Sequence, residues 1–448
     1  NTLTGAGSVT VPSGGLTGAV SGTSYTGFVT ANANTVLETA VDLDFDGAVD
    51  LGTGDLVVKA RDGLAINLGT VGGGGFAMNN TGLGNITAAS TTFETLGSDD
   101  ITVGGVTATG TANTGMLTLN SGNDLEFSGS DSTFASGVTG TAAEDIEVAT
   151  GIALDSSGSL LSLTAEDLLR VSADADVLGN GGNLVLTGKG LSNAGIGVVI
   201  VQAASDSGNL DPSGTTTLAT TATGTITITG TGGQTSGTAN KGVEIGDEST
   251  GDRNSILIET ASGDIDITGT GGVWDAPEGN NTQVSGLRLS SLTLRTTAGG
   301  NITATGTGPT SATSVSGDRD GIAIENDVLV STFVATSPPT DPYGAITLVG
   351  DAHGTGEGVD MNDTTDIEVV AASGGLTIEG EVLGAAGDAY AVTASGTVLN
   401  ARGGAVEITG LAGQGGGDGL DLANGTVLGS SETTSITLTG TARGGSLD

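Results

Sequence analysis

A short strand motif that recurs along the second half of the chain constrains the fold more than any other feature. The motif Gly-x-Ile-Thr-x-Thr-Gly is first complete at Gly224–Gly230 and returns, with small changes, as far as Ser435–Gly440. Its closing glycines stand at positions 230, 269, 306, 350, 380, 410 and 440, at intervals of 39, 37, 44, 30, 30 and 30 residues. Self-similarity of this kind is the signature of repeat proteins, in which neighbouring repeats bury one another's core.

Aligning the copies on the closing glycine separates two faces of the predicted strand. Aliphatic residues stand four positions before that glycine, at Ile226, Ile265, Ile302, Ile346, Leu376, Val406 and Ile436. They stand again two positions before it, at Ile228, Ile267, Ala304, Leu348, Ile378, Ile408 and Leu438. Between these two columns lie the polar residues Thr227, Asp266, Thr303, Thr347, Thr377, Glu407 and Thr437. Because alternate residues of a strand face opposite sides, stacked copies should form inward aliphatic ladders and an outward polar ladder.

Each repeat contains two further strand signatures. The second signature occurs as Gly242-Val-Glu-Ile, Gly286-Leu-Arg-Leu, Gly321-Ile-Ala-Ile, Gly358-Val-Asp-Met and Gly419-Leu-Asp-Leu, with Ala389-Tyr-Ala-Val in that place in one repeat. A third short strand follows in most repeats, for instance at Leu292-Thr-Leu, Ile367-Glu-Val and Val398-Leu. The first half has a shorter period, because motifs that begin at Asp100, Asp124, Asp145 and Asp167 lie 24, 21 and 22 residues apart.

These patterns predict an all-β fold, a right-handed parallel β-helix (β-solenoid) with three short strands per coil and coils of about 22–30 residues. We expect three regions. Residues 1–60 form an irregular N-terminal β segment or cap, residues 61–223 a solenoid of short coils, and residues 224–448 a solenoid with longer, loop-bearing coils. The 82 glycines are expected at the coil corners, where tight turns require residues that tolerate positive φ.

Composition excludes several classes of function. The chain has 51 acidic and 11 basic residues, a formal net charge of −40, so nucleic acid is not an expected partner. With no cysteine and one histidine, neither a disulfide framework nor a thiolate metal site can form. The longest aliphatic runs, such as Gly197–Val201, are far shorter than the ~18 residues of a membrane-spanning helix, so we expect no transmembrane segment.

The tandem Gly-x-Ile-Thr-x-Thr-Gly-Thr-Gly strands, alternating with Gly-Val-x-Ile strands, resemble the β-strand-repeat surface proteins of bacteria. These are similar in style to filamentous-haemagglutinin-like adhesins and autotransporter passengers. The resemblance covers about residues 224–445 well and 50–223 loosely. It implies an extracellular solenoid at the bacterial cell surface with adhesive or structural work, and it carries over no catalytic residue.

The last strand motif, Ser435–Gly440, has no polar cap after it, although solenoids normally end in one. We therefore expect either a processed or partial chain or a protomer whose end is covered by a neighbour. A bare terminal coil would expose strand edges, which favours self-association into a fibre or layer.

One segment of the chain has the spacing of a metal-binding loop. In Asp42-Leu-Asp44-Phe-Asp46-Gly47-Ala-Val-Asp50 oxygen ligands alternate and a glycine stands sixth, as in the first half of a calcium loop. The closing acidic residue is missing, because Thr53 occupies the twelfth position. The simpler interpretation is a strand over Val41–Val49 with Leu43 and Phe45 inward and its aspartates in water. Ca²⁺ at Asp42, Asp44, Asp46 and Asp50 is the one cofactor that the sequence suggests.

Two further candidates concern catalysis. The pair Asp264 and Asp266 has the residue types of a glycoside hydrolase, but an outer strand face in solvent is the simpler interpretation. His353, in Gly350-Asp-Ala-His-Gly-Thr-Gly, is predicted to be a solvated corner residue rather than a base or ligand.

The sequence therefore favours a non-catalytic extracellular structural or adhesive β-solenoid, such as a stalk, a filament or surface-layer component, or an adhesin passenger. Its expected partners are further copies of itself, surface glycans, or the surface of a host or neighbouring cell. Two alternatives stay open: a β-helix enzyme that acts on extracellular polysaccharide, and a calcium-dependent binding module.

Overall fold

The computed structural model is almost entirely β-structure. It describes residues 9–11, 16–20, 24–25, 28–30, 32–40, 42–70, 75–191, 195–201, 215–233, 240–246, 256–273, 284–310, 319–332, 344–354, 356–362, 367–383, 391–413, 417–423 and 425–442. Among these residues the one helix is α1 (Asn80–Gly84), and no helix in this part of the chain is long and apolar enough to cross a membrane. The chain forms two compact units, residues 1–166 with 170–185, and residues 167–169 with 186–448.

Unit 1 contains three parallel sheets and, near the N-terminus, two smaller sheets of four and two strands. The first sheet has the order β2 (Leu16–Val20), β5 (Thr35–Thr39), β8 (Leu56–Ala60), β12 (Ser90–Thr95), β14 (Met116–Ser121), β17 (Val138–Ala142) and β20 (Leu161–Ala165). The second has the order β10 (Phe76–Met78), β9 (Ile66–Gly69), β13 (Ile101–Gly104), β15 (Leu125–Phe127) and β18 (Ile146–Val148), and the third β16 (Ser132–Thr133), β19 (Ala153–Asp155) and β22 (Asp176–Leu178). The remaining strands near the N-terminus are β1 (Val9–Val11), β4 (Phe28–Thr30), β7 (Val49–Asp50) and β11 (Ile86–Thr87) in one sheet, and β3 (Ser24–Tyr25) with β6 (Asp44–Phe45) in another.

Unit 2 has the same three-sheet construction. Its first sheet has the order β26 (Ile226–Thr231), β29 (Ile265–Thr270), β32 (Ile302–Thr307), β35 (Ile346–His353), β38 (Leu376–Leu383), β41 (Ala405–Leu411) and β44 (Ser435–Thr441). Its second has the order β24 (Val198–Ile200), β27 (Val243–Ile245), β30 (Leu287–Ser290), β33 (Ile322–Glu325), β36 (Val359–Asn362), β39 (Val392–Ser395) and β42 (Leu420–Ala423). The third has the order β25 (Thr216–Thr220), β28 (Ile256–Thr260), β31 (Leu292–Thr296), β34 (Leu329–Ser331), β37 (Glu368–Ala371), β40 (Val398–Ala401) and β43 (Val427–Leu428). Strands β21 (Leu169–Val171) and β23 (Leu184–Gly188) contain residues of both units.

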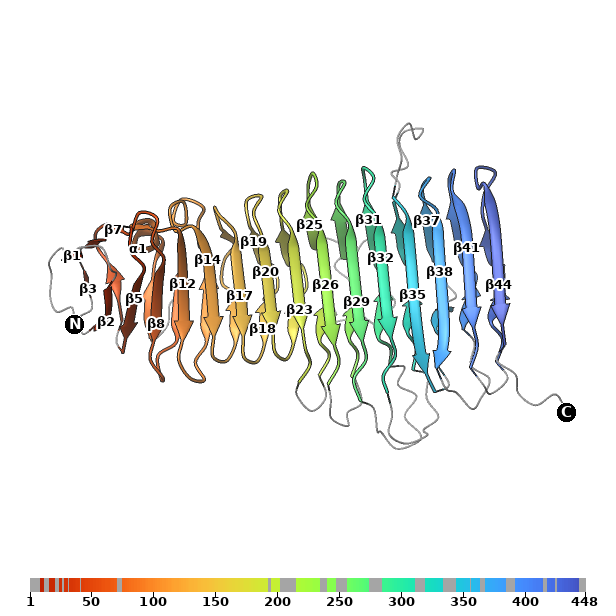
Figure 1. Cartoon of the computed structure of the whole chain (residues 1–448), viewed down its shortest axis with the longest axis horizontal. Coiled ribbons are helices and arrows are strands. Elements are labelled where there is room, and N and C mark those ends of the chain that lie inside the picture. Colours follow the sequence, from red (N-terminus) through yellow and green to blue (C-terminus); the bar gives the residue numbers. More distant parts are fainter. Residues whose placement is uncertain are drawn as a thin grey trace. The chain divides into compact units, whose positions relative to one another are not determined.

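From β14 to β43 each coil therefore contributes one strand to each of three parallel sheets, which confirms the predicted β-solenoid. Figure 1 shows the first-sheet strands of unit 2, from β26 to β44, side by side. Their register joins Ile226 to Ile265, Ile265 to Ile302, and so on to Ile436, as the alignment predicts. From Ile226 to Val406 the side chains of this ladder are at most 1 % exposed, and each such burial stabilises the fold by roughly 1.5–3 kcal/mol.

The shorter predicted period of the first half is also confirmed. Ile101 pairs with Leu125 and Leu125 with Ile146, which are steps of 24 and 21 residues. Unit 1 fills its core with aromatic rings, since Phe76 lies 6.0 Å from Phe93 between ring centroids and Phe127 lies edge-on to Phe134. The three regions predicted from repeat length stay a prediction, since the division into two units rests on contacts and not on period.

The glycines at the closing position of the strand motif have a different role from the one predicted. Gly350 lies inside β35 and is not among the glycines with positive φ. It is required by a close approach of backbone, since a Cβ at Gly350 would lie 2.6 Å from the carbonyl carbon of Gly358, which begins the next strand signature. The same holds in neighbouring coils, where Gly306 approaches Gly321 and Gly410 approaches Gly419. Positive φ does occur at corner glycines such as Gly375.

The register also corrects the alignment of one repeat. Val359 pairs with Val392, so Ala391 rather than Ala389 takes the place of the glycine that begins the second signature. Ala389 itself lies outside the described residues. The predicted assignment was wrong by two residues, a shift that preserves the inward and outward alternation and is therefore invisible in the pattern.

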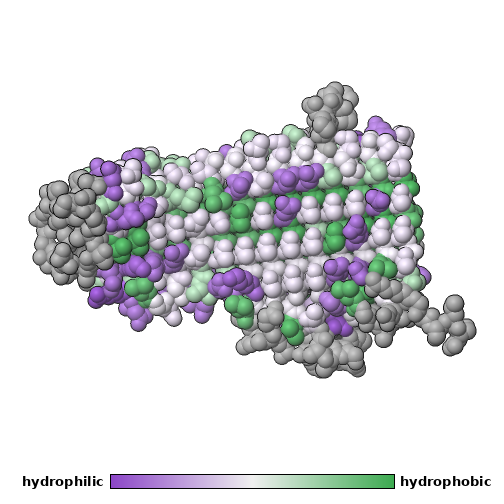
Figure 2. All heavy atoms as spheres, in the orientation of Figure 1, coloured by the Kyte–Doolittle hydropathy of each residue, from purple (hydrophilic) through white to green (hydrophobic). Residues whose placement is uncertain are grey.

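The outer face of the first sheet is weakly polar. In unit 2 the residues between the aliphatic ladders, such as Thr303 and Thr347, are paired in register and half-buried, while Asp266 and Glu407 are exposed. On the face in view, Figure 2 shows pale rows that run across the strands, green hydrophobic rows between them, and scattered purple hydrophilic patches. The predicted outward polar ladder is thus present.

Candidate functional site

The second sheet of unit 2 carries polar residues that are buried on what should be its outward face. One column lies within the strands and contains Glu244, Arg288, Ala323 and Asp360. The other column lies just before the strands and contains Lys241, Ser285, Asp320 and Glu357. We call these eight residues, seven of them polar and one the alanine Ala323, the polar columns. Six of them are at most 7 % exposed, and Glu244 and Glu357 are half-buried.

Backbone pairing brings the members of each column together. In the strands Glu244 pairs with Arg288, Arg288 with Ala323, and Ala323 with Asp360. Before the strands the register continues, because the Gly286 N–H donates to the carbonyl of Asp320 and the Gly321 N–H donates to the carbonyl of Glu357. Consecutive coils are about 4.8 Å apart, so residues in one column are direct neighbours.

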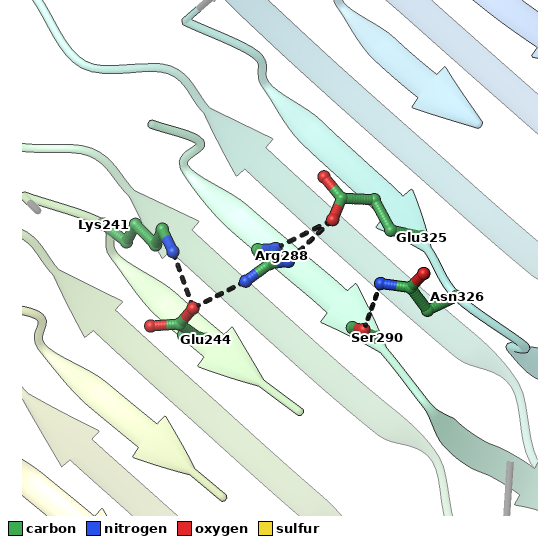
Figure 3. A network of polar contacts seen from close by, with 6 residues as sticks. All are labelled: Lys241, Glu244, Arg288, Ser290, Glu325 and Asn326. Carbon is green, nitrogen blue, oxygen red and sulfur yellow. Dashed lines mark hydrogen bonds and ion pairs between the residues drawn. The ribbon is translucent and has the colours of Figure 1, made fainter. Parts of the chain in front are cut away.

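The first half of the columns forms, together with the neighbouring Glu325, an ion network that balances its own charge (Figure 3). Glu244 Oε1 accepts from Lys241 Nζ at 2.6 Å and from Arg288 Nη1 at 2.9 Å. On the other side of Arg288, Glu325 Oε2 accepts from Nη2 at 2.7 Å and from Nε at 3.2 Å. Two carboxylates and two cations from three successive coils are therefore joined through Arg288.

Burial and the neighbouring glutamates shift the pKa of Arg288 in opposite directions. Burial alone lowers the pKa of Arg288, but the charges and hydrogen bonds of Glu325 and then Glu244 outweigh burial and raise this pKa above its ordinary value. The guanidinium is thus held charged in a site where its side chain is 3 % exposed.

The second half of the columns has a different charge. One carboxylate oxygen from each of Asp320, Glu357 and Asp360 lies within 4.8 Å of the other two. Ala323 occupies the position that Arg288 has in the preceding coil. The column within the strands therefore places no cation beside Asp320. Among the described residues this is the one group of three acidic side chains close enough to hold a metal ion together.

Asp320 is the central residue of this carboxylate group. It is 0 % exposed, and its Oδ1 accepts the backbone N–H of Glu357 at 2.8 Å. Its Oδ2 is also buried and accepts no hydrogen bond from the part of the chain that the structure describes. Burial, followed by the charges of Glu357 and Asp360, raises the pKa of Asp320 well above its usual range. Asp320 and Glu357 can form a carboxyl–carboxyl hydrogen bond only when one of the two carries a proton.

Arg319, which is adjacent to Asp320 in sequence, places its guanidinium beside Gly354. A Cβ at Gly354 would collide with that guanidinium, and the Arg319 carbonyl accepts the backbone N–H of His353 at 3.3 Å. His353 is half-buried at the end of β35, so its predicted place in a solvated corner is wrong, while its expected role as neither base nor ligand stays a prediction. The strand extends further than in most coils, because residues 346–353 pair throughout with residues 376–383.

His353 should give the protein a measurable pH dependence. Burial, followed by the charge of Arg319, lowers the pKa of His353, while Asp351 opposes this change. Burial, followed by the charge of Glu381, in turn raises the pKa of Asp351. Because the folded pKa is below the unfolded value near 6.5, the contribution of His353 to stability is complete above that value and is lost as the pH falls through the folded pKa.

We therefore expect His353→Gln to lose less stability than the unaltered chain when the pH is lowered from 7.5 to 5.5. The measurement is the difference in Tm between the two pH values for both proteins. An equal or larger loss in His353→Gln would contradict the assignment.

The aspartates of the predicted calcium segment do not lie on one continuous strand. Asp44 is on β6, which pairs with β3, whereas Asp50 is on β7, which pairs with β4 and β11. Asp42 is exposed and its Oδ1 accepts the Ala77 N–H at 2.9 Å, and Asp46 is exposed. The Asp50 Oδ1 accepts the Gly52 N–H at 2.9 Å, and the side chain of Asp44 lies outside the described residues. Leu43 and Phe45 are buried as expected, and Ca²⁺ binding by these aspartates stays a prediction.

The pair Asp264 and Asp266 is divided between two environments. Asp266 is exposed on the outer face of β29. Asp264 is half-buried at the corner before β29, where its Oδ1 accepts the backbone N–H of Asn301 in the next coil at 2.8 Å. Asn301 repeats the arrangement, because its Oδ1 accepts the Ala345 N–H at 2.9 Å. Asp264 therefore links successive coils at a corner.

Comparison of the chain with protein-family models, with curated proteins and with solved structures found no match.

Proposed function

We propose that this protein is a non-catalytic structural or adhesive β-solenoid of the bacterial cell surface, acting as a stalk, a filament or layer component, or an adhesin passenger. The observation that carries this proposal is the unbroken register of the first sheet in unit 2. Successive coils pair the same positions with each other without an offset, so the unit is a regular stack. A stack of this kind suits mechanical support and the display of loops.

The resemblance of the repeats to bacterial surface proteins supports the proposed extracellular location. The large negative charge supports it as well, because an acidic outer surface keeps a long repeat protein soluble and discourages non-specific contacts with nucleic acid. Recognition of a glycan or of another cell surface would then be carried by loops between coils.

Self-association is the second part of the proposal, and it concerns the strand edges of the stack. Ile436 and Leu438 on β44 are each 46 % exposed, whereas the equivalent residues of the preceding coil, Val406 and Ile408, are fully buried. Within the described residues β44 pairs on one side alone, with β41. Such an edge with apolar side chains can accept another strand, from a further coil or from a second copy, and we propose self-association through strand edges of this kind.

Sedimentation velocity over a range of concentrations, together with negative-stain imaging, tests this function. We expect larger species to form as the concentration rises and to appear as linear or layered assemblies. Leu438→Lys should suppress them because it places a charge on the exposed face, while Thr347→Lys on the outer face of β35 should not. Single particles at every concentration, or equal assembly in Leu438→Lys, would contradict self-association.

A further inference from the structure

We propose that Asp320, Glu357 and Asp360 bind one divalent cation, Ca²⁺, on the second sheet of unit 2. This inference does not depend on the proposed surface function. It concerns a different part of the chain from the predicted calcium segment, and it rests on the geometry of the three carboxylates and on one buried oxygen atom.

The spacing of the three carboxylates fits the cation. Calcium is bound by six to eight oxygen atoms at about 2.3–2.6 Å, so two of its ligands are at most about 5 Å apart. The three carboxylate oxygens lie within 4.8 Å of one another, and they can therefore contact one Ca²⁺ without rearrangement of the backbone. Water or main-chain oxygen would complete the coordination, leaving about three or more positions for them.

The buried oxygen of Asp320 is a second, independent indication of a ligand. Asp320 is fully buried, and its Oδ2 accepts no hydrogen bond from the described residues. A buried carboxylate oxygen without a donor is costly, because it has lost its hydration without gaining a partner. A divalent cation beside Oδ2 would provide the missing interaction and would also offset the repulsion from Glu357 and Asp360.

The position of the site suggests what the cation would do. Asp320 belongs to the coil of β33, whereas Glu357 and Asp360 belong to the coil of β36. A shared Ca²⁺ would therefore link two successive coils, as the Glu244–Arg288–Glu325 network links the coils before them. The alternative is that Asp320 and Glu357 share a proton instead, and the two cases respond differently to calcium.

The test uses the full chain freed of metal and measures Ca²⁺ binding by isothermal titration at 150 mM NaCl and pH 7.5. Thermal unfolding is followed in parallel with 1 mM CaCl₂ and with EDTA. We expect one tight, saturable site per chain and a Tm that is higher by several degrees with calcium. Asp320→Asn, which is close in shape, and Glu357→Gln should each weaken binding about tenfold or more and remove the calcium-dependent rise in Tm.

Two control variants separate this site from the general negative charge. Asp266→Asn on an exposed outer face and Asp46→Asn in the predicted calcium segment should both leave the tight site unchanged. The proposal fails if no saturable site is found or if Asp320→Asn binds calcium as the unaltered chain does. A third outcome would also contradict it: calcium has no effect on the Tm of the unaltered chain, and Asp320→Asn has a higher Tm than that chain, equally with calcium and with EDTA. That result would identify a proton shared by Asp320 and Glu357.

Mg²⁺ in place of Ca²⁺ should bind more weakly, since it requires shorter and more regular coordination.

Discussion

Replacing Gly350 with alanine should lower the free energy of unfolding by about 3 kcal/mol or more. The added Cβ would overlap the carbonyl oxygen of Gly358, and it would lie 2.6 Å from the carbonyl carbon of Gly358 and 2.9 Å from Val359 Cγ2. The Gly358 carbonyl cannot move away freely, because it accepts the backbone N–H of Ile322 in the neighbouring coil at 3.0 Å. The overlap is therefore between two backbones that the stack holds in place, and no side-chain rotation relieves it.

The measurement is urea unfolding followed by circular dichroism, with Gly425→Ala as the matched control. Gly425 has a φ of +88°, and a Cβ at that position would meet no atom within 4 Å. Alanine there costs about 1 kcal/mol for its left-handed conformation, with no overlap. If Gly350→Ala were no more destabilising than Gly425→Ala, the close approach of the two strands would not be a requirement of the fold.

The ladders could be predicted because the sequence admits one register. When Ile226 and Ile228 face inward, Thr227 must face outward, and a shift of one residue would bury the threonines and expose the isoleucines. Every copy repeats this constraint, so the alignment of copies is also the pairing of strands. This is why the fold class and the stacking of like residues follow from the sequence alone.

The role of the repeated glycines could not be predicted in the same way. Positive φ and close backbone approach both demand glycine, and the sequence does not distinguish them. At Gly350 the backbone of β35 in the first sheet lies against Gly358, which precedes β36 in the second sheet. This contact depends on how narrow the coil is at that point. The two-residue error at Ala391 has a similar origin, because a shift of two leaves the pattern of faces unchanged.

The carboxylate group was missed because its members are separated along the chain. Asp320 precedes the glycine of one second signature, while Glu357 and Asp360 flank the glycine of the next. Aligning the residue before each of those glycines would have placed Asp320 and Glu357 in one column. Their burial could not have been foreseen, because alternation assigns Asp360 to an outward face and gives no sign that this face is covered.

Replacing Arg288 with methionine should lower the free energy of unfolding by about 3–5 kcal/mol. Methionine fills much of the space of the arginine side chain, so the loss would come from charge rather than from a cavity. Glu244 would keep its ion pair with Lys241, but Glu325 would lose both of its hydrogen bonds from Arg288 and be left with a carboxylate whose side chain is 14 % exposed. An uncompensated buried charge of this kind is expensive even where the intact ion pair adds little net stability.

The charge argument makes a specific prediction for the double variant. Arg288→Met with Glu325→Gln removes the guanidinium and the carboxylate together, so it should recover most of the stability lost in Arg288→Met alone. Arg295→Met is the matched control, because Arg295 pairs with Glu259 on the third sheet, where the two side chains are 39 % and 28 % exposed, and exposed pairs contribute about 0–1 kcal/mol. Urea unfolding of the four proteins measures these differences. If Arg288→Met costs no more than Arg295→Met, or if Glu325→Gln restores nothing, then the columns are held by packing and not by their balanced charge. The second sheet would then contain no other example of successive coils held together by opposite charges, as the proposed calcium site requires.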